Sequence, residues 1–353
     1  MDTASLSALV DDEFAPTKTY LNTASCGLLP RRTLAAVTAL AQTLASGRAD
    51  GSGDFAVVEA VRDRFARLAG VGADRVAIGG SVSVHVGLIA ASLPPGAEVL
   101  APQGEFSSVV GPLAIREDLR MRYVPLDRIA ESVGPDTALV ALSSTQSADG
   151  RIAGLKAIRA AAADHGARTL IDATQSAGWL PMDAGEYDYT VTGGFKFLLC
   201  PRGTSFLTVT EAAQPALPPL YAGMGAAVDP WSSVYGPVER LSPTARRFDA
   251  PPAFLAYHGA ERSLALLDEI GVETVHAHAT GLAARLRAGL ARLGHETVPG
   301  DSPIVAAPGL GDREPELARA GVVASNRAGN LRAAFHLYNT EADVDRVLNV
   351  LAG

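Results

Sequence analysis

An aspartate and a lysine in the middle of the chain have the surroundings of catalytic residues. Asp172 stands at the end of the apolar run TLIDA, and Lys196 follows in VTGGFKFLL, between glycines and apolar residues. Strand ends border the ligand crevice in open α/β sheets, so a carboxylate there is a functional candidate. Burial lowers the pKa of a lysine, and the neutral amine can then form a Schiff base with a carbonyl group. The alternatives are an aspartate that caps a turn and a solvated lysine.

Lysine chemistry has only three candidates in this sequence. They are Lys18, Lys156 and Lys196, because all other members of the 30 basic residues are arginine. Lys18 lies near the N-terminus, and Lys156 lies at the start of an expected exposed helix. Lys196 is therefore the lysine that we expect to react.

Three further features are suited to holding a charged ligand. The turn GGSVS at 79–83 follows a strand-like run and opens a helix, where backbone N–H groups and the helix dipole bind phosphate. Phe106, after Glu105, places an aromatic ring at another expected strand end. Arg332 interrupts the apolar run LRAAFHLYNT and can pair with a carboxylate in a bidentate manner. The alternatives are an ordinary turn, a packed ring and a surface arginine.

The elements that must position these residues alternate between two types. Helical patterns cover 31–44, 55–68, 82–93, 107–118 and 154–165, and strand-like runs cover 75–79, 98–100, 121–126, 137–142, 168–173, 189–194 and 204–209. Strands that alternate with helices indicate crossover connections. We therefore expect an α/β fold with a mostly parallel central sheet flanked by helices.

The chain divides into three expected parts. An N-terminal arm (1–16) is expected to pack with the small domain, a large domain spans 17–252, and a smaller C-terminal α+β domain spans 253–353. Residues 215–252 are rich in Pro and Gly and show little periodicity, which is typical of a long functional loop. Two helices, from 254 and over 273–293, follow this loop. A strand, a turn and a helix capped by Thr340 end the chain.

Composition excludes several classes of protein. The 353 residues are 48% hydrophobic and 19% charged with a net charge of −8, so a buried core is expected and neither nucleic acid nor an anionic membrane is an expected partner. Two cysteines cannot form a disulfide framework. The N-terminal residues lack the pattern of a signal peptide, and no transmembrane run occurs. These features predict a cytoplasmic enzyme.

Several motifs together resemble one known family. IDATQSAGWLPMDAGEYDYTVTGGFKFLLCPRG resembles the cofactor segment of the class V aminotransferases, which are fold-type I enzymes that use pyridoxal 5′-phosphate (PLP). LNTASCGLLP, GGSVS, GEFSS, ARRFDAPP and LRAAFHLYNT match this family in the same order. The resemblance extends over nearly the whole chain and is greatest to the cysteine desulfurase-like and isopenicillin N epimerase-like subgroup.

The resemblance implies roles around the cofactor ring. Lys196 matches the lysine that forms the Schiff base and then moves a proton. Asp172 matches the aspartate that pairs with the pyridinium nitrogen, and Gln175 the glutamine that hydrogen-bonds the ring's phenolic oxygen. Phe106 stands where the family has a ring that stacks on the pyridine.

The resemblance also implies phosphate and substrate contacts. Ser81 and the backbone of Val82 match the phosphate-binding turn, and Arg332 matches the arginine that receives the substrate's α-carboxylate. Further candidates are Gln146, Thr192 and Gly194 for the cofactor and Cys26 for the substrate.

The sequence departs from the family pattern at the phosphate site. The second hydroxyl of the phosphate turn is replaced by Val82, and Phe195 stands where desulfurases often have histidine before the lysine. The segment 247–252 reads RFDAPP instead of RFEAGT, so it lacks the threonine that reaches the partner subunit's phosphate. We therefore expect weaker polar contacts to the phosphate.

The reaction is less sharply predicted than the cofactor. The desulfurase loop with its nucleophilic cysteine is absent between Arg327 and Arg332, and the two cysteines, Cys26 and Cys200, lie elsewhere. This favours lyase-type chemistry, a C–S lyase-like β-elimination on a cysteine-like amino acid, over transamination or epimerisation. A catalytically inactive binding partner is the non-enzyme alternative.

Partners and metals are also predicted. The family implies a homodimer in which the loop reaches the partner's site, and a small amino-acid substrate. No metal is expected, because His276 and His278 are two positions apart on a helical pattern and point to different faces.

Overall fold

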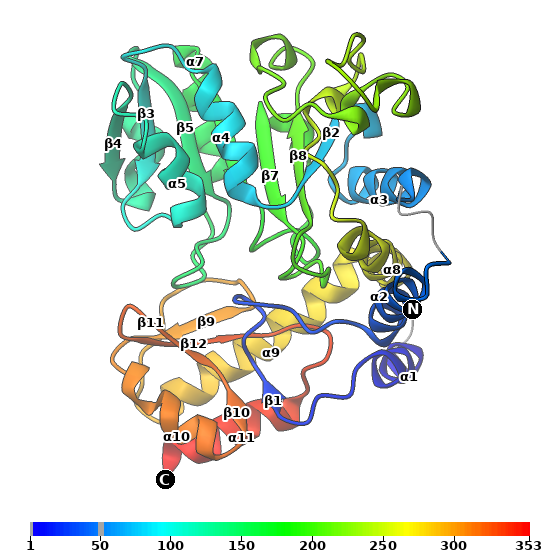
Figure 1. Ribbon diagram of the computed structural model, residues 1–353. Coiled ribbons are helices and arrows are strands. Elements are labelled where there is room, and N and C mark those ends of the chain that lie inside the picture. Colours follow the sequence, from blue (N-terminus) through cyan, green and yellow to red (C-terminus); the bar gives the residue numbers. More distant parts are fainter. Residues whose placement is uncertain (1–2, 49–52) are drawn as a thin grey trace.

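The computed structural model describes residues 3–48 and 53–353, and a seven-stranded sheet forms the centre of its larger part (Figure 1). Its strand order is β2-β8-β7-β6-β5-β3-β4. The strands are β2 (Val76–Gly79), β3 (Glu98–Pro102), β4 (Arg120–Val124), β5 (Thr137–Ser143), β6 (Arg168–Asp172), β7 (Tyr189–Gly193) and β8 (Ser205–Val209). Neighbours from β7 through to β4 run parallel, whereas β8 runs antiparallel to both β2 and β7. The sheet is thus mostly parallel, as the alternation predicts.

Both faces of the sheet are covered, and nearly all residues of its central strands are buried. Alternate residues of β5 point to opposite faces: Leu139 and Ala141 belong to one core cluster, Val140 and Leu142 to another. The first cluster includes residues of α4 (Val82–Ser92) and α5 (Ser107–Ala114). The second includes residues of α6 (Ile129–Ser132) and α7 (Leu155–His165).

The C-terminal part is built on a small antiparallel sheet of order β11-β12-β9. Its elements are α8 (Phe254–Ile270), α9 (Val272–Arg292), β9 (Ile304–Ala307), α10 (Glu314–Arg319), β10 (Val322–Val323), β11 (Ser325–Arg327), β12 (Asn330–Ala334) and α11 (Glu341–Ala352). Thr340 caps α11 in a capping box with Asp343, as its position predicts.

Helix α8 connects the two parts. It packs against α2 (Arg31–Ala45) and α3 (Phe55–Leu68), which precede the central sheet in the chain. Its buried Tyr257 belongs to the same core cluster as Phe65 of α3 and Phe206 of β8. We propose that the C-terminal domain begins at 253, with α8 as its attachment to the large domain.

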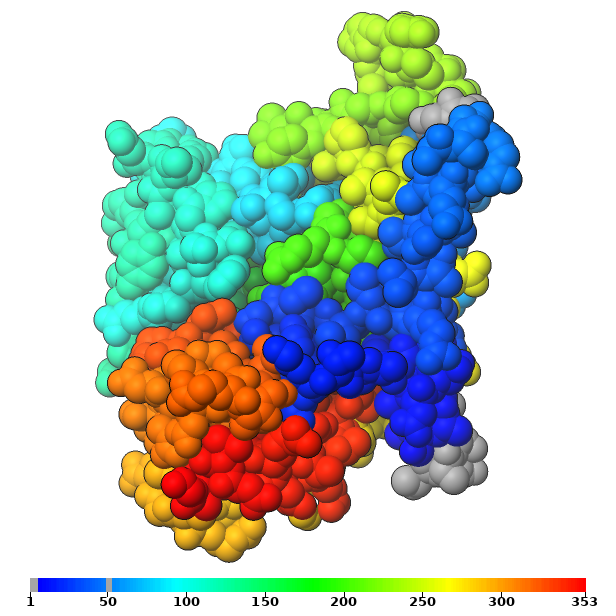
Figure 2. All heavy atoms as spheres, turned by 60° about the horizontal axis from the view of Figure 1, so that its bottom comes forward, coloured from blue at the N-terminus to red at the C-terminus, as the bar shows by residue number. Residues whose placement is uncertain are grey.

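The N-terminal segment crosses between the two parts. After α1 (Thr3–Glu13), the short strand β1 (Thr19–Tyr20) pairs in parallel with β10 of the C-terminal part. Figure 2 shows these first residues, in blue, beside the orange and red C-terminal part. The chain then returns to the large domain, so residues 19–27 pass along the junction between the two sheets.

The long loop over 215–252 projects from the large domain and contains only short 3₁₀ turns (Figures 1 and 2). It exposes large apolar side chains, among them Leu220, Trp231 and Tyr235, the last of them 92% exposed. Within the described residues, no helix has the length and apolar character needed to cross a bilayer.

Candidate active site

Lys196 lies just beyond the end of β7 and is only 5% exposed, whereas Lys18 and Lys156 are exposed. Burial lowers its pKa to about 8, because the ammonium loses its hydration. The positive charge of Arg332 lowers this pKa further, and the carboxylate of Asp172 opposes the shift. A substantial fraction of the amine is thus neutral near physiological pH, the form that attacks a carbonyl group.

Two other elements hold the lysine segment by its backbone carbonyls. The N–H of Gly27 donates to the carbonyl oxygen of Phe195 at 2.9 Å. The Nε2 atom of His336 lies 3.0 Å from the carbonyl oxygen of Phe197. A Cβ atom on Gly27 would lie 2.2 Å from the carbonyl oxygen of Lys196, so only glycine permits this approach. The position of Lys196 therefore depends on both the N-terminal segment and the C-terminal domain.

Asp172 ends β6, the central strand of the sheet, and is 4% exposed. Its Oδ1 atom accepts the N–H of Thr174 at 2.8 Å. Burial raises the pKa of Asp172 to about 6, and the negative charge of Glu105 acts in the same direction. The hydrogen bonds from Thr174 and the positive charge of Lys196 oppose this shift. A buried carboxylate of this kind is stabilised by a cationic partner, such as a protonated ring nitrogen.

Gln175 carries a buried amide that is only half satisfied. Its Nε2 atom donates to the carbonyl oxygen of Ala24 at 3.0 Å, while Oε1 has no hydrogen-bond partner within the described residues. The hydroxyl of Thr192, on the strand that leads to Lys196, is likewise buried without a partner. Buried polar atoms without partners are rare and costly, so they indicate a place for a polar ligand.

The expected phosphate turn lies between β2 and α4. Ser81 is the N-cap residue of α4, and its hydroxyl makes no capping bond but lies 3.0 Å from the hydroxyl of Ser83. A Cβ atom on Gly80 would meet nothing within 4 Å. Val82 is buried, and a second hydroxyl at this helix end belongs to Ser83, which we did not select from the sequence. The turn that we expect to hold the phosphate thus carries two hydroxyls.

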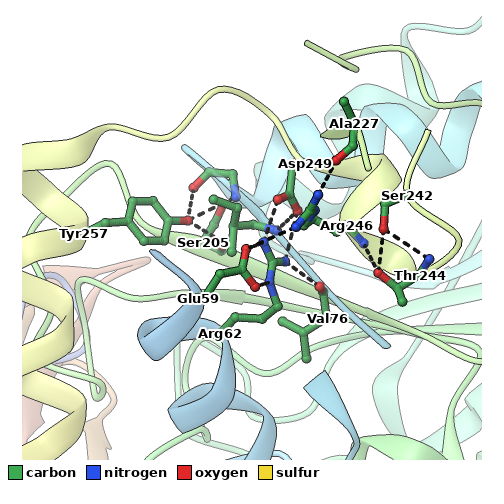
Figure 3. A network of polar contacts seen from close by, with 12 residues as sticks. Glu59, Arg62, Val76, Ser205, Ala227, Ser242, Thr244, Arg246, Asp249 and Tyr257 are labelled. Atoms are coloured by element: carbon green, nitrogen blue, oxygen red, sulfur yellow. Dashed lines mark hydrogen bonds and ion pairs between the residues drawn. The ribbon is translucent and has the colours of Figure 1, made fainter. Parts of the chain in front are cut away.

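A buried ion pair, drawn in Figure 3, contacts the strand β2 that leads into this turn. The Nη2 atom of Arg62 donates to Oδ2 of Asp249 at 2.6 Å, and Oδ1 of Asp249 also accepts the N–H of Ile78 at 2.9 Å. The hydroxyl of Tyr257 accepts the N–H of Gly79 at 3.1 Å and lies 2.9 Å from its carbonyl oxygen. Asp249 belongs to RFDAPP, so this segment is joined to the backbone that leads into the phosphate turn.

Phe106, which we expect to stack on the cofactor ring, presents its own ring to Lys196. It is 43% exposed, and its ring centroid lies 4.9 Å from the Nζ atom of Lys196. The preceding residue, Glu105, is buried and accepts the N–H of Phe106 at 2.6 Å and the Nε2–H of Gln146 at 3.0 Å. Gln146 therefore contacts Glu105, which the sequence interpretation did not select.

Arg332 projects from β12 away from the core of the C-terminal domain, which takes its neighbours Leu331 and Ala333. It is 1% exposed, and its Nη2 atom donates to the Ser25 hydroxyl at 2.7 Å. Burial lowers its pKa to about 10, and nearby Arg327 lowers it further. Its Nε atom is buried without a partner within the described residues. Arg332 thus has unused capacity for an anion.

The two remaining candidates, Gly194 and Cys26, and the nearby Cys200 have mainly structural contacts. Gly194 is required by packing, since a Cβ atom there would lie 2.4 Å from Oγ1 of Thr204. The Sγ atom of Cys26 lies 3.5 Å from the carbonyl oxygen of Gly27. Cys200 is buried, and burial raises the pKa of its thiol. Each lies next to the lysine segment in the chain or in space.

The paired histidines of α9 serve different neighbours. The Nδ1 atom of His276 lies 3.2 Å from the carbonyl oxygen of Trp179, and Nε2 of His278 lies 3.0 Å from that of Asn339. In the part of the chain that the structure describes, no three His, Cys, Asp or Glu side chains form a metal-binding group.

Comparison with known proteins identifies the class of protein that this fold and site define. The family described as "Aminotransferase class-V" matches residues 20–309, so the chain belongs to this family. An uncharacterized aminotransferase, YcbU of Bacillus subtilis, is 27% identical over 83% of each chain. Isopenicillin N epimerase of Streptomyces clavuligerus is 27% identical over 95% of this chain and 94% of its own.

Solved structures confirm the predicted fold-type I architecture. The cystine C–S lyase C-DES superposes with a TM-score of 0.84 at 24% identity, covering 95% of this chain and 97% of that one. A C-DES variant with glycine covalently linked to PLP superposes with a TM-score of 0.85 at 23% identity, covering 100% and 99% of the two chains. At this identity the likeness shows the fold alone.

The family depends on PLP, as predicted, and the residues here fit that cofactor. Lys196 would supply a buried amine for its aldehyde, and Asp172 a carboxylate for its ring nitrogen. Gln175 would supply an amide whose Oε1 has no partner within the described residues. Ser81 and Ser83 would supply hydroxyls at the N-terminus of α4 for its phosphate.

Proposed function

We propose that this protein is a PLP-dependent enzyme that acts at Cα and Cβ of an α-amino acid, with lyase-type β-elimination as its reaction. The cofactor, when bound, supplies an electron sink for the pair of electrons released at Cα. The single observation that supports elimination over persulfide transfer is the tight hairpin between β11 and β12. Arg327 pairs directly with Asn330, so the turn consists of Ala328 and Gly329 and has no room for a cysteine loop.

The chain's own residues support each part of such a reaction. Arg332 binds the substrate's carboxylate, because it is a buried cation whose Nε–H has no partner within the described residues. Lys196 takes the proton from Cα, since burial lowers its pKa and favours the neutral amine. The Cβ–S bond then breaks with its electron pair on the sulfur, and the proton held by Lys196 converts the departing thiolate to a thiol. Water hydrolyses the remaining 2-aminoacrylate, as its imine tautomer, to pyruvate and ammonia.

The names of relatives support the choice of substrate class without fixing the reaction. C-DES is named a cystine C–S lyase, YcbU an aminotransferase, and the Streptomyces protein an epimerase. All three names fit chemistry that starts at Cα of an amino acid. Neither Cys26 nor Cys200 lies on the hairpin that carries Arg332, which argues against persulfide transfer, and among the remaining reactions the likeness to C-DES favours elimination.

An absorbance spectrum of the purified protein tests whether it binds PLP through Lys196. We expect a visible band that borohydride removes and that Lys196→Ala lacks. Lys156→Ala is the matched control, because this lysine is exposed on α7, and it should keep the band. A protein that stays colourless after incubation with PLP would contradict the enzyme and favour a non-catalytic binding partner.

A panel of amino acids then separates the reactions. Release of pyruvate, ammonia and thiol from cysteine derivatives identifies elimination. Conversion of the cofactor to its pyridoxamine form identifies an aminotransferase, and racemisation of the substrate identifies an epimerase. Either of the last two results, without pyruvate, would overturn the proposed reaction.

We also propose a homodimer. The family resemblance supports it, and so do the exposed Leu220, Trp231 and Tyr235 of the 215–252 loop, since exposed apolar patches mark interaction sites. Light scattering coupled to gel filtration should give twice the chain mass, and a monomer at micromolar concentration would contradict the proposal.

A further inference from the structure

Arg327 and Arg332 lie on the same face of the β11–β12 hairpin. In the antiparallel register, Ser325 pairs with Arg332 and Arg327 pairs with Asn330. Paired residues share a face, and so do residues two apart on a strand. Arg327 is therefore the diagonal neighbour of Arg332, and both side chains leave the sheet in the same direction.

The two-residue turn fixes this register. Ala328 and Gly329 have positive φ angles of 51° and 80°, which agrees with the primed turns that favour tight hairpins. Such a conformation is uncommon for alanine. The turn leaves the Arg327 side chain exposed and close to the site that Arg332 serves.

Both guanidinium groups converge on one neutral hydroxyl. The Oγ atom of Ser25 accepts from Nη2 of Arg332 at 2.7 Å and from Nη2 of Arg327 at 3.2 Å. Within the described residues, no carboxylate lies within ion-pair distance of either arginine; the 18 ion pairs found there involve other residues. Two like charges that share one hydroxyl repel each other, and an anion between them would relieve that repulsion.

A third positive charge lies nearby. The guanidinium of Arg202 stacks over the ring of Phe195, 4.1 Å from its centroid. Together with Arg327 and Arg332, it lowers the pKa of Lys196. The entrance to the site is therefore strongly positive although the whole chain carries a net charge of −8. A single α-carboxylate bound to Arg332 would leave the positive charges of Arg327 and Arg202 without a counter-charge.

We infer that the substrate carries a second anionic group on its side chain, which Arg327 binds while Arg332 holds the α-carboxylate. This inference rests on the proposed function, because it takes an amino acid as the substrate of this site. The second anion lies a few bonds from Cα, since the two guanidinium groups meet at one hydroxyl. Such a substrate is an acidic amino acid or a cysteine derivative with an acidic S-substituent.

A pair of matched substrates tests the inference with the holoenzyme. S-Carboxymethyl-L-cysteine and S-carbamoylmethyl-L-cysteine have nearly the same shape and differ in the charge of the distal group. We expect kcat/KM for thiol release to favour the acid by about tenfold or more, as a charge-assisted hydrogen bond contributes. In Arg327→Met this preference should fall to near unity, and in Arg327→Lys part of it should remain. Arg262→Met, an exposed arginine on α8, is the control and should keep the preference.

A binding measurement provides a readout that does not depend on turnover. Succinate has two carboxylates and propionate one, and neither can be eliminated. Calorimetric titration of the holoenzyme should show a larger loss of affinity for succinate than for propionate in Arg327→Met. An equal loss for both would mean that Arg327 serves the α-carboxylate alone, and this would overturn the inference.

Failure of the inference and failure of the proposed function give different experimental results. If the two cysteine derivatives react equally well in the wild-type enzyme, the proposed eliminating enzyme is supported, and the inference of a second anionic group on the substrate is wrong. If neither substrate changes the cofactor's spectrum or releases a product, and succinate binds no more tightly than propionate, both are wrong.

Discussion

The carboxylate of Glu105 accepts two hydrogen bonds from Ser143, one from its backbone N–H at 2.8 Å and one from its hydroxyl at 2.6 Å. Ser143 is the last residue of β5 and pairs with Asp172 on the neighbouring strand. Glu105 therefore joins the segment that carries Phe106 to the strand end beside the central aspartate. We infer that Glu105 acts by positioning this segment.

Glu105→Gln should destabilise the protein by about 1–3 kcal/mol, because the new amide offers donors where the carboxylate accepted them. Urea unfolding of the variant and the wild type measures the difference. Ser143→Ala removes only the hydroxyl contact and should cost less. A Glu105→Gln variant as stable as the wild type would show that these contacts contribute nothing.

Asp249→Asn should weaken both stability and cofactor binding. The change removes the buried carboxylate that pairs with Arg62 and leaves only the half-exposed Glu59 as its partner, which costs up to about 3–5 kcal/mol, and it alters the acceptor for the N–H of Ile78 ahead of the expected phosphate turn. Urea unfolding and a PLP titration measure the two effects. Glu59→Gln removes the half-exposed partner of Arg62 and should have a much smaller effect on both. If the PLP affinity of Asp249→Asn is unchanged, the ion pair does not affect cofactor binding at the turn.

The stability of the cofactor-free protein should fall as pH rises through the pKa of Asp172. Burial raises this pKa from 3.8 to about 6, so the folded state binds the proton more tightly than the unfolded state. The contribution is fully present below pH 3.8 and is lost as pH rises through about 6, an effect of roughly 3 kcal/mol.

Asp172→Asn isolates this effect from that of Asp249, whose pKa is also raised to about 6 by burial. The stability of Asp172→Asn relative to the wild type should increase between pH 4 and pH 7. Urea unfolding over this range measures it. A difference that does not change with pH would mean that Asp172 titrates alike in the folded and unfolded chain.

The amine of Lys196 should react with acylating reagents in a pH-dependent manner with a midpoint of about 8 in the cofactor-free protein. Competitive acetylation followed by mass spectrometry of peptides measures it, with Lys18 and Lys156 as internal references. Asp172→Asn should move the midpoint to lower pH, because the carboxylate raises the pKa of Lys196. A midpoint that moves upward would contradict the assigned interaction.

Gly27→Ala should disturb the lysine segment far more than Gly80→Ala disturbs the fold. The new Cβ atom at position 27 would lie 2.2 Å from the carbonyl oxygen of Lys196, whereas one at position 80 meets nothing within 4 Å. Overpacking of this kind costs about 1–3 kcal/mol. Thermal unfolding compares the two variants, and equal melting temperatures would contradict the close approach.

The large domain was predictable because its signals are local. The apolar runs of β5 and β6 are long enough to identify buried strands, and Asp172 stands at the end of one of them. The family resemblance and the fold class follow from these segments and are confirmed by the comparisons. The expected loss of a phosphate contact at Val82 stays a prediction, and the structure adds that Ser83, one residue further on, hydrogen-bonds the hydroxyl of Ser81.

The junction was not predictable from local patterns. Strands β1 and β10 have two residues each, too few for any periodicity. The contacts of Ser25 with Arg327 and Arg332 join residues that lie about 300 positions apart in the chain, and no spacing in the sequence records them. Glu105 lies beside a residue that we selected, yet its role depends on Ser143 of a different strand.

The N-terminal segment has a consequence for how the enzyme is made. Ser25 and Arg332, which meet through one hydrogen bond, are separated by 307 residues. At a synthesis rate of about 5–20 residues per second, the ribosome needs roughly 15–60 s to travel from one to the other. During this interval the seven-stranded sheet can form while Ser25 still lacks its contacts with Arg327 and Arg332. The proposed carboxylate site is therefore assembled only after the whole of this sheet has been synthesised.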